Sequence, residues 1–116
     1  MSHQVEDTAF VIAYYRAQDV EFSKDPYAQL WQNKGAVQIA DLFQDQVSPY
    51  DGILHCARNR CILEMLEKHA APEDNSLVIN IGAGFSMYPY VLNSKLQHLE
   101  IDLPNVASYK REEVRR

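Results

Sequence analysis

The sequence predicts an α/β fold in which a helical N-terminal region precedes the first β-α-β unit of an incomplete parallel sheet. Through most of residues 1–70, apolar residues recur at the spacing of a helix. At Leu77 the pattern changes to a short apolar run that ends in a Gly-Ala-Gly turn, and a second short run follows at 99–101. Helices followed by alternating strands and helices are typical of an α/β fold. We therefore expect a helical region over 1–75 and the first part of a ligand-binding α/β domain over 76–116.

Four helical segments are expected in the first part. One runs from Val5 to about Val20, where apolar residues form a stripe with a period near 3.6. Asp25-Pro26 predicts the next helix start, because Asp caps a helix and proline suits its first position; this short helix should end near Gly35. A third segment follows at 37–43. The fourth, from about Tyr50 to His69, carries a wide apolar stripe: Ile53, Leu54, Ala57, Cys61, Ile62, Met65 and Leu66. Residues 71–75 then break the pattern.

The second part is expected to begin with a buried parallel strand over Leu77–Ile81. A short crossover helix at 88–93 leads to the strand at 99–101, and Pro104 starts a terminal helix that continues through Val114. Parallel strands are normally covered on both faces and belong to larger sheets, and open strand edges promote association. The chain is therefore expected to be a fragment that lacks a C-terminal half, or to be completed by a homo-oligomer or another chain.

The strand ends predict a ligand site. Gly82, Ala83 and Gly84 follow the first strand, and Glu100 and Asp102 close the second. In an open α/β sheet, ligands bind outside the carboxyl ends of the strands, where these residues should meet. Glycines let the backbone approach a ligand, and an acid after the next strand can bind both hydroxyls of a ribose. The pattern therefore predicts a nucleoside-cofactor site.

S-adenosylmethionine suits this site better than a dinucleotide. The dinucleotide fingerprint has a third glycine three positions after the second, whereas Met87 stands here. No basic residue is placed for a pyrophosphate, and S-adenosylmethionine has no phosphate. The alternatives are a nicotinamide-dependent oxidoreductase and a strand-turn-strand unit without any ligand.

Composition narrows the expected partners. The formal net charge of −5 argues against nucleic-acid binding, which requires a basic face. There is no signal peptide or transmembrane run, so we expect a cytoplasmic protein that does not contact membranes and keeps its cysteines reduced. A zinc site built from His55, Cys56, Cys61 and His69 lacks the usual short spacings, and no metal is expected.

Four segments resemble the leucine carboxyl methyltransferase-like group of class I S-adenosylmethionine-dependent methyltransferases, which includes O-methyltransferases linked to polyketide pathways. Tyr15-Arg-Ala17 with Asp25-Pro-Tyr-Ala28 is similar to the Arg-Ala … Asp-Pro-x-Ala signature of that group. Ala57-Arg58-Asn-Arg60 is similar to its Arg-containing helix. Val78-Ile-Asn-Ile-Gly-Ala-Gly84 matches its first cofactor motif, and Glu100-Ile-Asp-Leu-Pro104 with Lys110 matches its Glu-x-Asp-x-Pro … Lys segment.

The resemblance implies an N-terminal half of a Rossmann-like methyltransferase and assigns roles to its residues. Gly82 and Gly84 would contact the cofactor, Asp102 would hold the ribose hydroxyls, and Arg58 would pair with the methionine carboxylate, with help from Arg16. The chain departs from the group at Ser86, where many members have Asp, and at Met87-Tyr88, where they have Thr-Arg. These departures place local cofactor contacts or the stability of the turn in question.

The expected activity is methyl transfer to a hydroxyl or carboxylate of a small molecule, or to a protein carboxylate. The catalytic residues stay unassigned, because none of the four histidines has a partner pattern. The alternative is a non-catalytic module that associates with itself or another chain through exposed strand edges.

Overall fold

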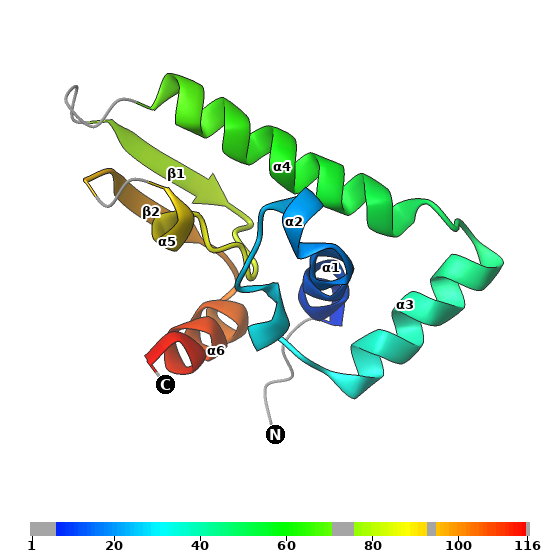
Figure 1. Cartoon of the computed structure of the whole chain (residues 1–116). Helices are drawn as coiled ribbons and strands as arrows, with labels where there is room; N and C mark the ends of the chain where they lie inside the picture. The colour runs from blue at the N-terminus through cyan, green and yellow to red at the C-terminus, as the bar shows by residue number, and fades with distance from the viewer. Residues whose placement is uncertain (1–6, 71–75, 93–94, 116) are drawn as a thin grey trace.

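The computed structural model describes residues 7–70, 76–92 and 95–115, and it is a mixed α/β fold (Figure 1). Five helical segments come first: α1 (Asp7–Gln18), α2 (Val20–Ser23), the 3-10 helix η1 (Ala28–Leu30), α3 (Lys34–Gln46) and α4 (Asp51–His69). They are followed by β1 (Leu77–Ile81), α5 (Tyr88–Val91), β2 (Gln97–Ile101) and α6 (Pro104–Arg115). The predicted change from helices to a β-α-β order is confirmed.

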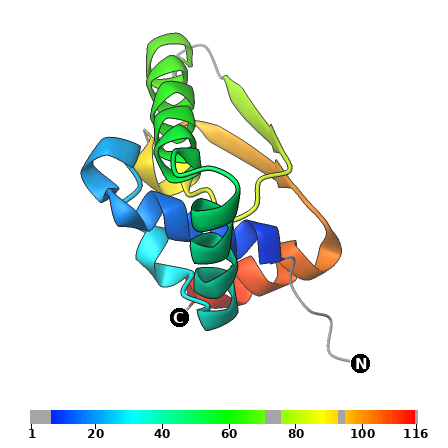
Figure 2. The same ribbon diagram turned by 90° about the vertical axis from the view of Figure 1, so that its right-hand side faces the viewer.

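The two strands form a parallel pair whose register joins Leu77 to Gln97 and Ile81 to Ile101. Side chains alternate between the two faces of the sheet, and Figure 2 shows the helices gathered on one side of it. The opposite face is open. The expectation that Leu77–Ile81 is a buried strand is therefore wrong: Leu77, Ile79 and Ile81 are 50%, 55% and 78% exposed.

Most of the helix predictions are confirmed, but two boundaries differ. The first helix ends at Gln18, because Asp19 caps α2 by accepting a hydrogen bond from the Phe22 N–H at 3.0 Å. The helix expected from Asp25-Pro26 to Gly35 shrinks to the short η1. Gly35 instead lies in the first turn of α3, which Asn33 caps at the Ala36 N–H. The predicted start at Val5, the predicted end at Asn93 and the break at 71–75 lie outside the described residues.

The apolar stripe expected on α4 is largely wrong, because none of its residues is buried and Ile53, Leu54, Cys61 and Met65 are exposed. The buried residues of the helix are instead Cys56, Asn59 and Leu63, and from the expected stripe Ile62 and Leu66 pack in part against the cluster that contains Leu63. No helix in the described part of the chain is both long enough and apolar enough to cross a membrane.

An aromatic cluster anchors the turn that follows β1. Phe85 stacks on Trp31 with 4.4 Å between the ring centroids, and it meets Phe10 edge-on at 4.8 Å. Trp31, Phe85, Phe10 and Val106 are all buried in one cluster, which joins α1, the segment after η1, the turn and α6. The Gly-Ala-Gly turn thus begins on the sheet and ends in the core, which gives its backbone a defined position.

Candidate functional site

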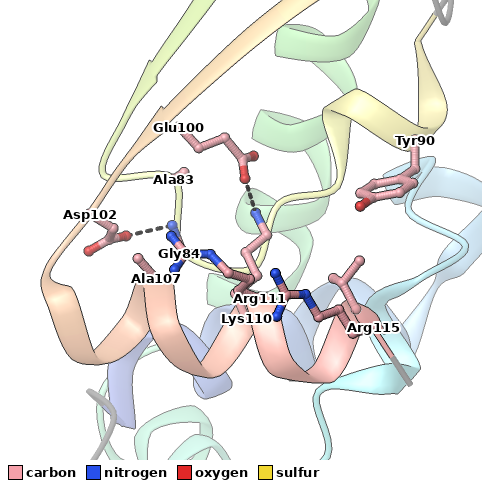
Figure 3. Close-up of a pocket in the computed structure, with 10 residues that line it drawn as sticks. Ala83, Gly84, Tyr90, Glu100, Asp102, Ala107, Lys110, Arg111 and Arg115 are labelled. Carbon is pink, nitrogen blue, oxygen red and sulfur yellow. Dashed lines mark hydrogen bonds and ion pairs between the residues drawn. The ribbon is translucent and has the colours of Figure 1, made fainter.

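Two cavities meet at the Gly-Ala-Gly turn, and Ala83 and Gly84 line both of them. The first, of about 260 Å³, opens between the turn, α1 and α4, and we call it the helical cavity. The second, of about 300 Å³, lies between the turn, the end of β2 and α6, and we call it the α6 cavity (Figure 3). Together they contain every residue predicted for the cofactor: Arg16, Arg58, Gly82, Ala83 and Gly84 in the helical cavity, with Glu100 and Asp102 in the α6 cavity.

The two glycines of the turn have backbone conformations that other residues rarely adopt. Gly82 has a φ of 69° and Gly84 a φ of 52°. A Cβ atom added at either position would meet no other atom within 4 Å. The space beside both backbones is therefore open, and a ligand could approach the main chain there without meeting a side chain.

The N–H groups of the turn are all used within the fold. Those of Gly82 and Ala83 donate to the Ile101 carbonyl at 2.7 and 3.2 Å, and that of Gly84 donates to Oδ2 of Asp102 at 2.6 Å. The carbonyl groups of Gly82 and Gly84 accept no hydrogen bond from another described residue. This turn consequently offers acceptors to a ligand and does not offer the donors that bind an anion.

Asp102 is held in place by two backbone groups. Its Oδ2 accepts from Gly84, and its Oδ1 accepts from the Leu103 N–H at 2.7 Å. An ionised carboxylate has about four lone-pair sites, so roughly two remain unused, and Asp102 lines the α6 cavity. That capacity equals the two hydroxyls of a ribose.

Glu100 is engaged by a lysine. Its Oε1 lies 2.8 Å from Nζ of Lys110 (Figure 3). The same Nζ also donates a hydrogen bond to the Ser86 carbonyl. Burial lowers the pKa of Lys110, while the hydrogen bond and charge of Glu100 act in the opposite direction. Lys110 thus connects β2 to the segment after the glycine turn. Glu100, which was predicted to bind the cofactor, therefore has a structural role in this connection.

The two predicted arginines differ in their surroundings. Arg16 is 6% exposed, and its Nε lies 2.6 Å from Oδ2 of Asp25, which is 3% exposed. Nη2 of Arg16 is buried and has no hydrogen-bond partner. Arg58 is exposed, and no described residue pairs with it. The helical cavity therefore contains two guanidinium groups with unused donors.

Several residues that sequence reasoning did not select hold Arg16 in place. Ser23 Oγ donates to the Arg16 carbonyl at 2.9 Å, and Asn59 Nδ2 donates to the Ser23 carbonyl at 2.7 Å. Tyr88 Oη in turn donates to Asn59 Oδ1 at 3.0 Å. The sequence offered one signal for this arrangement, Asp25, whose expected role was a helix cap and whose side chain pairs with Arg16.

Ser86, which departs from the resembled pattern, stabilises the turn by hydrogen bonds. Its hydroxyl donates to the Ala83 carbonyl at 2.8 Å and accepts from Nδ2 of Asn80 at 2.9 Å. Asn80 belongs to β1, so this pair closes the turn against its own strand. The turn is thus stabilised by hydrogen bonds from Ser86 and Asn80, without an acid at position 86.

His55, which the sequence suggested only as part of a rejected zinc site, also lines the helical cavity. Its Nε2 lies 3.5 Å from Oδ2 of Asp51, one helical turn earlier on α4. Its ring stacks on Tyr15 with 5.5 Å between centroids and 10° between planes. Burial lowers the pKa of His55; Asp51 raises it in part, and Arg58 and Arg16 lower it further.

Neither cysteine lines one of the two cavities. Cys56 is buried and its Sγ contacts the Tyr15 carbonyl at 3.2 Å, while Cys61 is exposed. Within 7–70, 76–92 and 95–115, no three His, Cys, Asp or Glu residues gather as metal ligands.

Comparisons with protein-family models, with curated proteins and with solved structures gave no match.

Proposed function

We propose that the chain binds S-adenosylmethionine across the Gly-Ala-Gly turn and belongs to a methyltransferase. The observation that carries this proposal is the hydrogen bond from the Gly84 N–H to Asp102, at the point where the two cavities meet. It joins an open glycine backbone to a carboxylate with spare acceptor capacity. On the other side of the same turn lie the donors of Arg16 and Arg58.

The groups of the cofactor match this arrangement in order. An amino-acid end needs donors for its carboxylate and acceptors for its ammonium group. Guanidinium groups bind carboxylates well, and the carbonyls of Gly82 and Gly84 are available acceptors. A ribose needs acceptors for two hydroxyls, which Asp102 supplies.

The same hydrogen bonds argue against a dinucleotide. In a dinucleotide-binding turn the backbone N–H groups face the pyrophosphate. Here those of residues 82–84 are bonded to Ile101 and Asp102. A phosphate at this turn would find carbonyl oxygens, which repel it.

Methyl transfer from a sulfonium is an in-line displacement, in which the protein mainly positions donor and acceptor. We propose an acceptor on a small molecule or a protein carboxylate, a cytoplasmic location, and a Rossmann-like sheet of the leucine carboxyl methyltransferase-like group. The parallel β1–β2 pair with helices on one side supports the fold proposal. Its open second face is consistent with a sheet that a C-terminal half or another chain covers on that side.

Calorimetry tests the binding. We expect S-adenosylmethionine and S-adenosylhomocysteine to bind, and NAD to give no heat. Asp102→Asn should weaken binding about tenfold or more, because hydrogen bonds to a charged group contribute about 1.5–3 kcal/mol. Asp45→Asn, on the exposed surface of α3, is the matched control and should leave binding unchanged. Equal affinity in both variants, or binding of NAD alone, would contradict the proposal.

A second candidate function rests on the open face of the sheet. Leu77, Ile79, Ile81, Leu99 and Ile101 are 45–78% exposed there, and they are neighbours across the register of the two strands. Contiguous exposed apolar side chains are typical of an interaction surface, and both outer strand edges among the described residues are open. A non-catalytic module that associates through this face is therefore the alternative.

Sedimentation across a hundredfold range of concentration separates the two candidates. The association module would be favoured if the chain associates with rising concentration, if Ile79→Lys abolishes this association, and if S-adenosylmethionine gives no calorimetric heat. Leu42→Lys, at an exposed position on α3, is the control for a general change of surface charge. A monomer at all concentrations would exclude self-association through the sheet.

A further inference from the structure

We propose that His55 accepts the proton of the methyl acceptor, and that the acceptor is consequently a hydroxyl group of an alcohol or phenol. This inference rests on the proposed function, because it assigns a role beside the same cofactor. A carboxylate is already a nucleophile at neutral pH and needs no base, whereas a hydroxyl benefits from one.

The position of His55 is the first argument. It lies on α4 three residues before Arg58, so both side chains are on neighbouring parts of one helix surface. Both line the helical cavity, whose other wall is formed by Gly82, Ala83 and Gly84. His55 and the glycine turn therefore line one and the same cavity.

The second argument is the way the ring is held. Stacking on Tyr15 fixes the plane of the imidazole, and Asp51 lies beside Nε2 at 3.5 Å. The His55 side chain is 21% exposed, so it is accessible from the cavity without being free in solvent. Nδ1 has no partner among the described residues and is left to accept a proton.

The surrounding charges give this histidine the protonation state of a base. Asp51 on α4 favours the imidazolium, while Arg58 on α4 and Arg16 on α1 disfavour it. Tyr15, also on α1, has its pKa raised by burial and by Asp51 and therefore stays neutral. With burial as the largest effect, the pKa of His55 falls below 6.5, so the ring is neutral at pH 7. Asp51 can then stabilise the charge that appears when the ring accepts a proton.

The step balances with these groups. The acceptor oxygen forms a bond to the methyl carbon while the sulfur–carbon bond breaks, and the electron pair of that bond stays on the sulfur. The hydroxyl proton moves to Nδ1 of His55, which later releases it to water. No oxidant, metal or further reactant is required.

The test compares two ligands that differ by one charge. S-adenosylmethionine carries a sulfonium, whereas S-adenosylhomocysteine carries a neutral thioether. If His55 lies beside the reacting sulfur, its pKa, measured by NMR in the full chain, should be about half a unit or more lower with S-adenosylmethionine than with S-adenosylhomocysteine. The reason is that the positive charge of the sulfonium at close range disfavours the positively charged imidazolium. His55→Gln identifies the resonance. His69, at the exposed C-terminal end of α4, is the internal control, and its resonances should be the same in both complexes.

The outcomes distinguish the two proposals. Binding of both ligands with one and the same pKa for His55 would overturn its role and leave the cofactor proposal standing. Calorimetric silence towards both ligands would overturn the cofactor proposal, and the role of His55 with it. A lower pKa with S-adenosylmethionine alone supports both.

Discussion

Asp25→Asn tests the ion pair that places Arg16 in the helical cavity. Nε of Arg16 and Oδ2 of Asp25 are 2.6 Å apart, and their side chains are 7% and 3% exposed. Asparagine has the same shape and keeps an oxygen for the Tyr27 N–H, which lies 3.1 Å from Oδ1 of Asp25. The substitution therefore removes the charge and little else.

The expected cost follows from burial. Removing one partner of a buried pair leaves the other charge without compensation, which costs about 3–5 kcal/mol. A domain of this size has a free energy of unfolding of about 5–15 kcal/mol. Asp25→Asn should therefore remove a large part of the stability. With a urea dependence of about 1–3 kcal/mol per M, the unfolding midpoint should fall by roughly 2 M.

Urea unfolding followed by circular dichroism provides the measurement, with two comparison variants. Glu64→Gln breaks two exposed ion pairs, with Lys24 and with Arg60, and should move the midpoint little. Arg16→Met combined with Asp25→Asn removes both charges, and it should be more stable than Asp25→Asn alone. An Asp25→Asn midpoint equal to that of the wild type would refute the reasoning. So would a double variant less stable than the single one.

Three further predictions concern the turn, the core and the histidines. Gly84→Ala should lower the free energy of unfolding in urea by about 1–2 kcal/mol, because Gly84 has a positive φ. The added methyl group should also fill the open space beside the backbone and abolish the calorimetric heat of S-adenosylmethionine binding. Unchanged binding would show that no ligand approaches the backbone there. Phe85→Ala should lower the free energy of unfolding by about 3–5 kcal/mol, since Phe85 is 2% exposed and stacked on Trp31; a thermal midpoint near that of the wild type would contradict this packing. Burial lowers the pKa of both His55 and His98 below 6.5 in the folded chain. These two histidines therefore bind protons more readily in the unfolded chain than in the folded one. The free energy of unfolding should consequently fall as the pH decreases below 6.5. Replacing both histidines by glutamine should remove this slope in urea titrations between pH 5 and 7, and a persistent slope would assign it to other groups.

The sequence predicted the part of the candidate site that lies at the ends of the strands. Glycines after one strand and an acid after the next must meet when the strands are parallel neighbours, because carboxyl ends of parallel strands share one edge. Gly84 and Asp102 do so through a direct hydrogen bond. Arg16 and Arg58 were selected through resemblance alone, since helical spacing does not reveal which residues from separate helices share a cavity.

The residues that were missed depend on long-range contacts. His55 had no partner pattern in the sequence except Asp51, a spacing that is common on exposed helix surfaces. Its place opposite the glycine turn follows from how α1 and α4 pack. Asn59 and Tyr88 are 29 residues apart and meet only because α5 packs beside α4.

The sequence by itself determined the order of the elements, the parallel strands and the glycine turn, because these depend on local periodicity, on proline and glycine, and on short-range chemistry. Only the tertiary structure decided which strand face is covered, that Asp25 pairs with Arg16, and that Lys110 forms an ion pair with Glu100. Burial and ion pairing are properties of the packed chain: an apolar strand is compatible with one covered face or two, and a carboxylate takes the partner that packing brings to it.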